Sequence, residues 1–573
     1  MTTVESVHSD IRSRRVPITA AAVFFWFSAI FMLFWALGTR ELWTAENRWA
    51  EITRNMLLSG DYFHPKINGE PYFDKPLIGY WTIALASKLT GRLDEFAIRL
   101  PSAVAGLVTL WMTILLGKRL WSAEAGRIAG WLLLGCYGFV FWARTGQADM
   151  ENVAFTMAAI AWYWARRDRP GFTTSLVFYV ICFVGAQMKG LGAIAVPCLA
   201  VFPDLLRDRR WKHFLTLSHA AALALALLVY FAPFMMEKMT RGTYGESGLD
   251  LVFRENVERF FEPFDHKEPF YIYFYHLPIL FLPWAPLLLI ALVAAMSRGR
   301  ELLSADYPTR WAMEASLIIF LFFTVSGSRR GYYILPLVPF CSLLCARFLI
   351  STSLAKPRRL AIDLQATIAL VSAVGGVVVA AALPLVRRRL PIPLTPAFFA
   401  GLMALSLLAL VPWALRNRRA ALLEQLAGVK EGLAVPLVSA AVLMCGYLCF
   451  QHTDLDSLRT TRTFVRSIRS SEPDPKNLAF YQVTPTAIAS VVYYLNDREP
   501  HPVLQTPQEV VQFLNVRPGS NSLLITRGAY PILAADFPPG FVAEEVAAEA
   551  MPHWEGANAM SKKWLMIRSK PSL

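Results

Sequence analysis

Two short stretches near the amino terminus place acidic, basic and aromatic side chains close together. Glu46, Arg48 and Trp49 form the first, and the second reads Pro71-Tyr72-Phe73-Asp74-Lys75-Pro76. Arginine and lysine bind phosphate, whereas carboxylates bind hydroxyls or move protons. The spacing also fits a helix-end acid with an Arg48–Glu51 pair, and a belt of aromatic rings around a snorkelling lysine. Each stretch is therefore a candidate binding site only in combination with others.

Further ionisable residues lie beside long apolar runs. Asp149 and Glu151 stand at the mouth of two such runs, and Lys189 separates two more with almost no polar loop around it. An ionisable group at such a position is costly unless it pairs or faces an aqueous cavity, so a functional role is its default interpretation. Another mouth holds two basic and two aromatic residues, Arg329, Arg330, Tyr332 and Tyr333.

A polar segment from about 237 to 270 adds more such groups. Its candidates are Glu255, Arg259, Asp265, His266 and Glu268. The combined set of phosphate-binding cations, carboxylates and rings is the mixture that a lipid-linked phosphosugar requires. No glycine-rich phosphate loop, Walker motif or Gly-x-Ser-x-Gly elbow is present, so nucleotide hydrolysis and serine-hydrolase chemistry lack support.

The composition requires a lipid solvent around most of this chain. The 573 residues are 55% hydrophobic and 17% charged, with a mean hydropathy of +0.40. Soluble multidomain enzymes, disordered chains and coiled coils are excluded by these values. The net charge of +14 comes largely from basic residues in short loops, which is typical of membrane topology and not of a nucleic-acid-binding surface. The seven cysteines lie in apolar runs, which favours packing over metal binding.

The chain is predicted to be a polytopic α-helical membrane protein with about thirteen spans. The run Leu77–Gly91 is too short to cross and is placed along the interface. With that choice most basic loops fall on one side, so the amino terminus is cytoplasmic and the carboxyl terminus is outside. The predicted runs are 18–38 (an uncleaved anchor), 98–118, 123–143, 151–166, 172–188, 190–206, 214–235, 271–297, 311–326, 331–351, 366–386, 397–415 and 433–451.

Two domains follow from this topology. Residues 1–451 form the membrane domain, with outer loops at about 39–99 and 237–270, and residues 452–573 form a small soluble α/β domain. In the tail, strands are predicted at 478–481, 491–494 and 522–526, and helices at 484–489 and 507–514. In the first outer loop, residues 47–58 form an amphipathic helix that ends before Gly60 and is expected to lie on the membrane surface.

The ordered set of motifs resembles the bacterial C-type (GT-C) glycosyltransferases related to protein mannosyltransferases. The likeness is greatest to the lipid A 4-amino-4-deoxy-L-arabinose transferases and covers about 1–450. It rests on the run Leu42–Ile52, Gly60-Asp61, Tyr72–Pro76, Asp149, Lys189-Gly190, His266 with Pro269-Phe270, and Arg330 with Tyr333–Pro336. Each motif is weak alone, and the set is specific.

The resemblance implies a bacterial inner-membrane enzyme with a GT-C fold and a cavity open to the periplasm. Its donor is a sugar on undecaprenyl phosphate, its acceptor is a phosphate of lipid A, and transfer inverts the anomeric centre. No organic cofactor and no nucleic-acid partner are implied, whereas Asp74 and His266 could share a divalent cation such as zinc. The catalytic residues implied are Glu46, Lys75 and Asp149, and those for substrate binding are Arg48, Trp49, Tyr72, Asp74, Lys189, Glu255, Arg259, Arg330 and Tyr333.

One departure from the family pattern leaves the acceptor open. The family usually has Asp-Glu where this chain has Ala45-Glu46. A hydroxyl acceptor must lose a proton, whereas a phosphate is already ionised, so the missing acid argues against a hydroxyl acceptor. Alternatively Glu46 moves into its place, or the substrate differs. A same-fold transferase with another polyprenyl-linked sugar or a protein or glycan acceptor, and a lipid or solute transporter, remain the rival functions.

Overall fold

The computed structural model describes most of the chain. The described residues are 20–43, 45–207, 209–240, 248–258, 261, 267–297, 306–386, 396–416, 420–430, 432–453, 460–472, 474–550 and 561–570.

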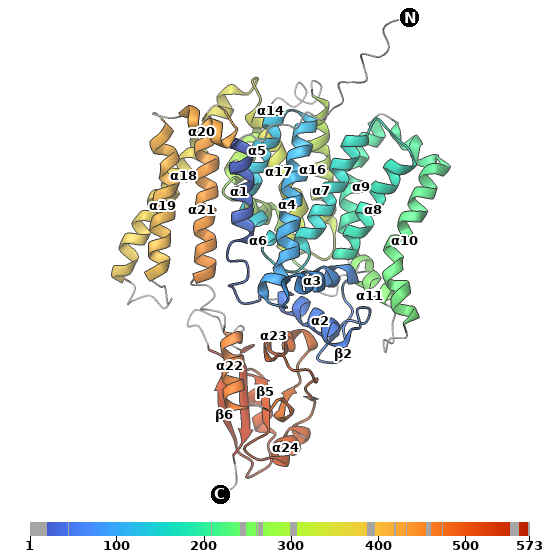
Figure 1. The fold of residues 1–573 in the computed structure, drawn as a ribbon, viewed down its shortest axis with the longest axis vertical. Helices are drawn as coiled ribbons and strands as arrows, with labels where there is room; N and C mark the ends of the chain where they lie inside the picture. The colour runs from blue at the N-terminus through green and yellow to red at the C-terminus, as the bar shows by residue number, and fades with distance from the viewer. Residues whose placement is uncertain are drawn as a thin grey trace, which may run out of the picture.

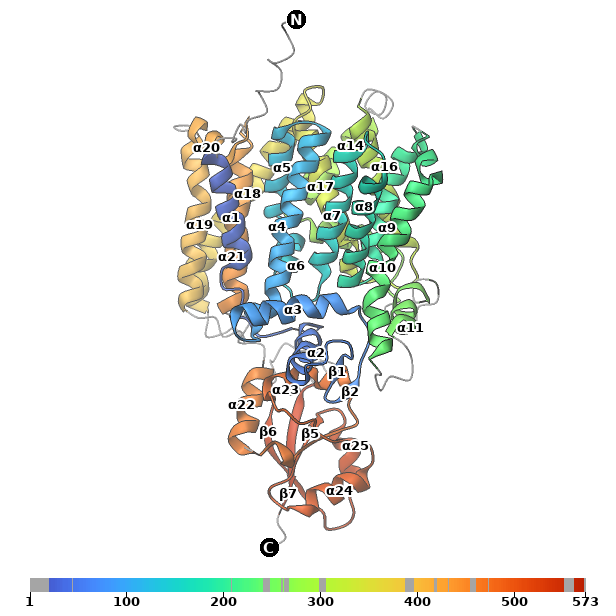
Figure 2. The same cartoon turned by 45° about the vertical axis from the view of Figure 1, so that its right-hand side comes forward.

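A bundle of roughly parallel helices forms the larger part of the molecule (Figures 1 and 2). Each of the apolar runs predicted to span is helical over most of its length. The helices are α1 (Ala20–Phe34), α4 (Glu95–Leu120), α5 (Ala123–Leu134), α6 (Tyr137–Ala143), α7 (Asp149–Arg166), α8 (Phe172–Met188), α9 (Gly192–Arg207), α10 (Leu217–Met239), α13 (Ile272–Leu280), α14 (Ala285–Ser297), α16 (Tyr307–Val325), α17 (Val338–Leu349) after the 3-10 turn η3 (Gly331–Leu337), α18 (Ala355–Val386), α19 (Pro396–Arg416) and α21 (Ala434–Thr453), with the short α20 (Ala420–Ala427) before the last.

Two of the predicted straight spans are broken. The run 123–143 is the pair α5 and α6, bent by 70°, and 271–297 is the pair α13 and α14, bent by 118°. The backbone N–H of Tyr137 donates to Leu282 O at 2.9 Å, so the two breaks face each other and satisfy part of the freed backbone. By length and composition six helices among the described residues can cross a membrane, or eight with each bent pair as one span. Thirteen crossings therefore stays a prediction.

Helix α3 (Leu77–Thr90) runs across the end of the bundle instead of along it (Figure 2). This course agrees with the interfacial placement expected for the short run 77–91. The helix ends at Thr90 and is followed by Gly91, whose φ of 78° is the left-handed conformation that glycine adopts at low cost. Asp94 then caps α4 by accepting from the Ala97 N–H at 3.0 Å.

The predicted amphipathic helix is present as α2 (Ala45–Ser59), but the prediction that it lies on the membrane surface is wrong. It packs between α3 and the carboxyl-terminal domain, and side chains on both of its faces are buried. On its polar face, Arg54 donates to both oxygens of Glu51 at 2.7 and 2.8 Å. Because the two charges neutralise each other, this face can be buried. A hairpin of β1 (Lys66–Ile67) and β2 (Glu70–Pro71) follows.

The carboxyl-terminal domain is an α/β fold, as predicted, with a five-stranded sheet in the order β4-β3-β5-β7-β6. Strands β3, β4 and β5 are parallel, and β7 is antiparallel to both of its neighbours. The predicted strand 491–494 is instead part of helix α23, because Ile488, Val491, Val492 and Leu495 make one buried helical face. The elements are α22 (Thr461–Ser471), β3 (Leu478–Tyr481), α23 (Pro485–Leu495), β4 (Val503–Leu504), α24 (Pro507–Val516), β5 (Ser522–Thr526), α25 (Tyr530–Ala535), β6 (Ala543–Ala548) and β7 (Trp564–Ser569).

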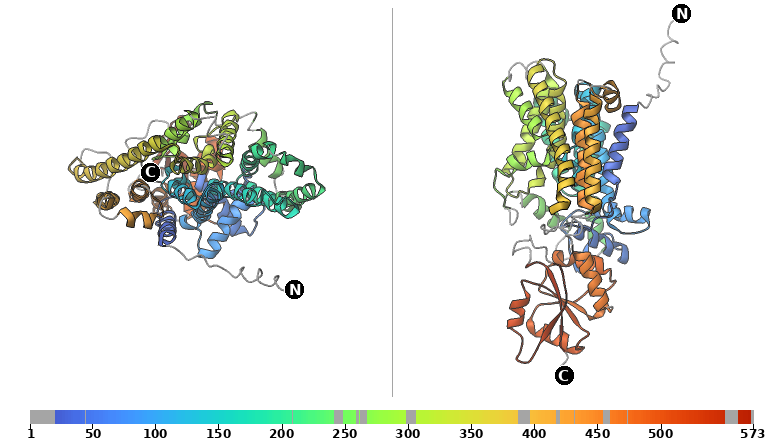
Figure 3. Two further views of the ribbon diagram at one scale, coloured as in Figure 1. Left: turned by 90° about the horizontal axis from the view of Figure 1, so that it is seen from above. Right: turned by 90° about the vertical axis from the view of Figure 1, so that its left-hand side faces the viewer.

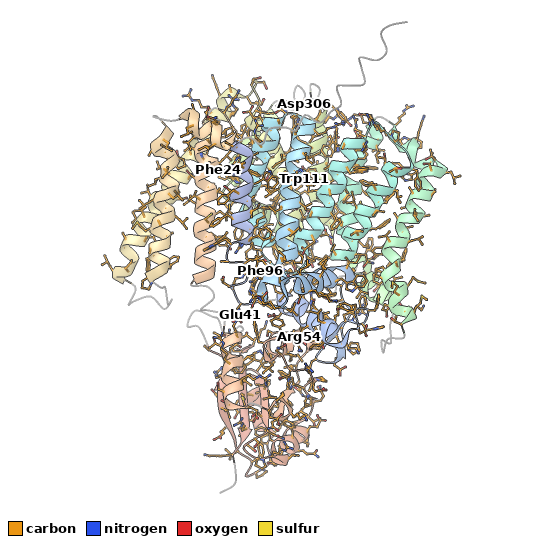
Figure 4. The ribbon with its side chains drawn as sticks, viewed as in Figure 1. Phe24, Glu41, Arg54, Phe96, Trp111 and Asp306 are labelled. Atoms are coloured by element: carbon orange, nitrogen blue, oxygen red, sulfur yellow. The ribbon has the colours of Figure 1, made fainter. Side chains whose placement is uncertain are left out.

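This domain and α2 lie at one end of the bundle, and α1 begins at the other (Figures 1 and 3). Figure 4 shows Glu41 and Arg54 near the domain and Asp306 at the opposite end. We call the end next to the carboxyl-terminal domain the outer end.

Candidate active site

Four residues of the first outer loop form a compact charged cluster. Arg48 of α2 meets Asp74 with an Nη1–Oδ2 distance of 2.8 Å, and the same nitrogen donates to the Tyr72 hydroxyl at 3.2 Å. The ammonium of Lys75 lies 3.3 Å from Asp74 Oδ2. The structure thus brings together residues that the sequence placed in two separate stretches.

Tyr80, which packs on Trp49, also holds Asp74 in place. The Tyr80 hydroxyl donates to Asp74 Oδ1 at 3.3 Å, and the ring of Tyr80 lies 4.4 Å from that of Trp49. Trp49 is only 1% exposed, so it supports Tyr80 and presents no surface to a ligand. Sequence reasoning overlooked Tyr80 because it lies inside an apolar run.

The charges of this cluster reinforce one another. Burial alone would raise the pKa of Asp74, but the charges of Arg48 and Lys75 outweigh burial and hold that pKa below its usual value. Burial would lower the pKa of Arg48, and the nearby charge of Asp74 raises it instead. Asp74 and Arg48 therefore both remain ionised near neutral pH.

A second charged group comes from three other elements. Asp149, the first residue of α7, pairs with Lys189 just beyond the end of α8. The Lys189 ammonium lies 5.5 Å from the centre of the Tyr332 ring, and Arg330 Nη1 donates to the Tyr332 hydroxyl at 3.0 Å. Tyr332 packs in turn on Trp142 with ring centres 4.3 Å apart.

The two groups interact through their charges. The charges of Lys75 and Arg330 act on Asp149 as well as that of Lys189, and Arg48 acts on the Tyr332 hydroxyl. Asp149 is 8% exposed, and its Oδ2 has no hydrogen-bond partner among the residues that the structure describes. A buried carboxylate oxygen with spare accepting capacity can bind a hydroxyl or ammonium group of a ligand.

Glu46 lies outside this cluster in a saturated pocket of its own. Both oxygens bind Arg99 at 2.8 Å, and they also accept from the backbone N–H groups of Gly146 at 2.8 Å and Trp43 at 2.9 Å. Burial would raise the pKa of Glu46, but the charge and hydrogen bonds of Arg99 lower it to about 2. The carboxylate is 0% exposed. This environment suits a residue that positions α2 and does not suit a proton acceptor.

The remaining candidates are only partly placed. Tyr333 packs on Tyr332 with ring centres 5.2 Å apart, and Tyr332 contacts Lys189 and Arg330. Arg259 and His266 lie outside the described residues, as does the side chain of Glu255. The sequence places Tyr332 at the same mouth as Arg330 and Tyr333, but of the two tyrosines only Tyr333 was assigned to substrate binding.

The Asp74 surroundings do not fit the divalent cation implied by the resemblance. Arg48, Lys75 and the Tyr80 hydroxyl all direct donors at the Asp74 oxygens. No group of three or more His, Cys, Asp or Glu side chains gathers as metal ligands in the part of the chain that is described. A metal at Asp74 would have to displace two cations, so no step is assigned to one.

Close packing at Gly79 joins the two halves of the site. A Cβ at this position would lie 2.3 Å from Met188 O and 2.7 Å from the Trp49 ring. Met188 directly precedes Lys189, so Gly79 sets the distance between α3 and the second charged group.

Replacing Gly79 by alanine is expected to push α3 away from Met188 and Trp49 and so to shift the two charged groups relative to each other. The rate of the reaction at this site should then fall about tenfold, because a shift of about 1 Å in binding groups is costly. The matched control is Gly375→Ala in α18, where a Cβ would meet nothing within 4 Å. Initial rates of both variants, normalised to folded protein, test this. Equal rates would show that the close approach has no bearing on the site.

The chain is similar in sequence to known proteins over about half of its length. A family model described as dolichyl-phosphate-mannose-protein mannosyltransferase matches residues 74–236. An undecaprenyl phosphate-alpha-4-amino-4-deoxy-L-arabinose arabinosyl transferase of Pseudomonas aeruginosa (strain UCBPP-PA14) is 29% identical over 320 residues, 54% of this chain and 56% of the relative. A second protein of that name, from Sodalis glossinidius, is 32% identical over 322 residues with the same two coverages. This chain thus spans a little more than half the length of these relatives.

Solved structures give a likeness over nearly the whole chain. The crystal structure of ArnT from Cupriavidus metallidurans bound to undecaprenyl phosphate aligns with a TM-score of 0.68 at 19% identity, covering 95% of this chain and 97% of ArnT. Its apo state gives a TM-score of 0.65 at 21% identity with the same coverages. This chain therefore has the fold of ArnT and, over about half its length, is similar in sequence to the two arabinosyl transferases named above.

Proposed function

We propose that this chain is a membrane glycosyltransferase that moves 4-amino-4-deoxy-L-arabinose from undecaprenyl phosphate to a phosphate of lipid A. The observation that carries the proposal is the joint cluster at the outer end, in which Arg48, Lys75, Lys189 and Arg330 surround Asp74 and Asp149. Basic groups outnumber carboxylates in it, which suits a phosphate ligand. The names of the relatives and the ArnT fold support the same donor.

The chemistry assigned to the cluster is a single displacement. An oxygen of the acceptor phosphate attacks the anomeric carbon, a new carbon–oxygen bond forms, and the bond from that carbon to the polyprenyl phosphate breaks. The leaving phosphate takes the electron pair, and Lys75 and Arg48 stabilise its growing charge. Asp149 orients the sugar through its available Oδ2. Attack opposite to the leaving group inverts the anomeric centre.

Ala45 favours an acceptor that is already ionised. Glu46 cannot take the place of the family's missing acid without breaking its bonds to Arg99, Gly146 and Trp43. A phosphate acceptor requires no base, whereas a hydroxyl acceptor does. This favours lipid A over the rival protein or glycan acceptor.

The proposed location is the bacterial inner membrane, with the cluster and the carboxyl-terminal domain on the periplasmic side. The basic groups near the opposite end support this orientation, because such groups are retained in the cytoplasm. Among them are Arg167, paired with Asp204 at 2.7 Å, and Arg207, paired with Glu314 at 2.8 Å.

A transfer assay with mass spectrometry tests the function directly. The purified chain in lipid vesicles, given lipid A and undecaprenyl phosphate-linked aminoarabinose, is expected to add one aminoarabinose mass to a lipid A phosphate. An added mass from another polyprenyl-linked sugar would identify a different donor. Movement of lipid across the vesicle with no covalent product would overturn the proposal in favour of transport.

A further inference from the structure

We propose that the carboxyl-terminal domain is a clamp that holds the Arg48 and Asp74–Lys75 segments in position, with Tyr494 as its main positioning residue. This inference rests on the proposed function for its kinetic readout, but its structural basis is independent. Three sets of contacts carry it, each joining the domain to a segment of the first outer loop that leads to Arg48 or to Asp74–Lys75.

The first contact is made by the Tyr494 hydroxyl, near the end of α23. It accepts a hydrogen bond from the Leu42 N–H at 2.9 Å and donates one to Glu95 Oε1 at 3.0 Å. Arg462 secures this arrangement, because its Nη2 lies 2.5 Å from Glu95 Oε1 and its guanidinium lies 5.6 Å from the centre of the Tyr494 ring. Donor and acceptor capacity of this phenol are thus both used.

The two partners of Tyr494 are the two sides of the Glu46 pocket. Leu42 adjoins Glu41, whose carbonyl binds Arg99 Nη2 at 3.0 Å. Glu95 lies one helical turn before Arg99 on α4. Tyr494 therefore bridges the segment that carries Glu46 to the helix that carries Arg99. Since Glu46 and Arg48 share the first turn of α2, this bridge also helps to fix Arg48.

The second contact is on the next turns of α2. Arg54, already paired with Glu51, donates through Nη1 to the Asp497 carbonyl at 2.7 Å. Arg54 is 7% exposed and Glu51 is fully buried, so the covered polar face of α2 depends on the domain.

The third contact holds the hairpin that leads into Tyr72–Lys75. Asn68 forms a reciprocal pair with His501, its amide donating to the His501 carbonyl at 2.7 Å and its oxygen accepting from the His501 N–H at 2.8 Å. Asn68 has φ of 51°, and a Cβ on the next residue, Gly69, would lie 3.0 Å from Pro500. The hairpin turn is therefore fitted to this surface of the domain.

The clamp explains how two loop segments keep one geometry. Arg48 and Lys75 lie on separate elements, α2 and the segment after β2, and both contact Asp74. The domain contacts α2 directly and contacts the hairpin that leads into the second segment. A group that must bind a phosphate benefits from this fixed geometry because less ordering is needed on binding.

The test compares two neighbouring phenols in the full-length protein. Tyr494→Phe removes the bridge, whereas Tyr493→Phe removes a hydrogen bond from the same helix to the Leu93 carbonyl at 3.0 Å, which does not touch the Glu46 segment. We expect Tyr494→Phe to raise the KM for the polyprenyl donor about tenfold with a smaller change in kcat, and Tyr493→Phe to leave the KM within about twofold of wild type. Asn68→Ala should also raise the KM, through the second segment.

Hydrogen exchange supplies a readout that does not need activity. The amides of residues 42–48 are expected to exchange faster in Tyr494→Phe than in Tyr493→Phe, at equal melting temperature. If Tyr494→Phe and Tyr493→Phe show equal amide exchange at residues 42–48 and equal KM for the donor, the clamp is overturned. A wild-type protein without transfer activity would overturn the proposed function only, since the exchange comparison would still decide the clamp.

Discussion

Replacing Asp149 by alanine is expected to lower the rate of sugar transfer by about a hundredfold or more. Asp149 pairs with Lys189 and has the one carboxylate oxygen of the described cluster that lacks a hydrogen-bond partner. Removing it unpairs a cation and deletes the group proposed to orient the sugar. Lys75→Ala should show a comparable loss, because it removes a charge assigned to the leaving phosphate.

Steady-state transfer rates in vesicles measure both effects. Asp149→Asn separates charge from shape, since it keeps the size of the side chain and should still lose most of the rate. Asp168→Asn serves as a matched control, because Asp168 pairs with Arg210 at 3.0 Å near the opposite end of the bundle. Rates equal to wild type in both Asp149→Ala and Lys75→Ala would remove these residues from the site.

Replacing Glu46 by alanine is expected to destabilise the protein by about 3–5 kcal/mol. Arg99 is 1% exposed and would be left buried without its carboxylate partner, which is the costly way to break such a pair. Thermal unfolding and the yield of monodisperse protein measure the loss. The double variant Glu46→Leu with Arg99→Met removes both charges and should recover much of the stability, because apolar replacement of a whole buried pair is often close to neutral.

The pH dependence of stability tests the same pocket. Since the folded pKa of Glu46 is about 2 and its ordinary value is 4.5, its contribution is complete above pH 4.5 and is lost as the pH falls toward 2. Wild-type protein should therefore lose stability over this acidic interval more steeply than the double variant. If the double variant is as unstable as Glu46→Ala, the unpaired charge of Arg99 is not the cause of the lost stability.

Local sequence patterns were sufficient for most helices but not for their surroundings. The apolar runs, and the short run Leu77–Gly91 that does not cross, could be predicted because periodicity and run length are properties of neighbouring residues. The amphipathic pattern of α2 was equally legible, yet it was assigned to the membrane surface. What covers its polar face is Asp497, 443 residues away in the sequence from Arg54, and no local pattern contains that contact.

The site shows the same division. The residue types and their common outer location followed from the sequence, because ionisable groups beside apolar runs are costly and basic loops orient the chain. Their roles did not follow. Glu46 stood in the most conspicuous motif, but Arg99, 53 residues later, saturates its hydrogen bonds. Tyr332 was not assigned a role, yet its ring lies against the Lys189 ammonium.

The sequence by itself determined that this chain lies in a membrane, which groups face one end of it and which chemical class of ligand they suit. Only the tertiary structure decided which carboxylate is locked and which has an available oxygen, and that the last domain covers the first loop. The reason is physical: burial and hydrogen-bond saturation are set by partners that are distant in sequence, and these partners determine what a charged group can do.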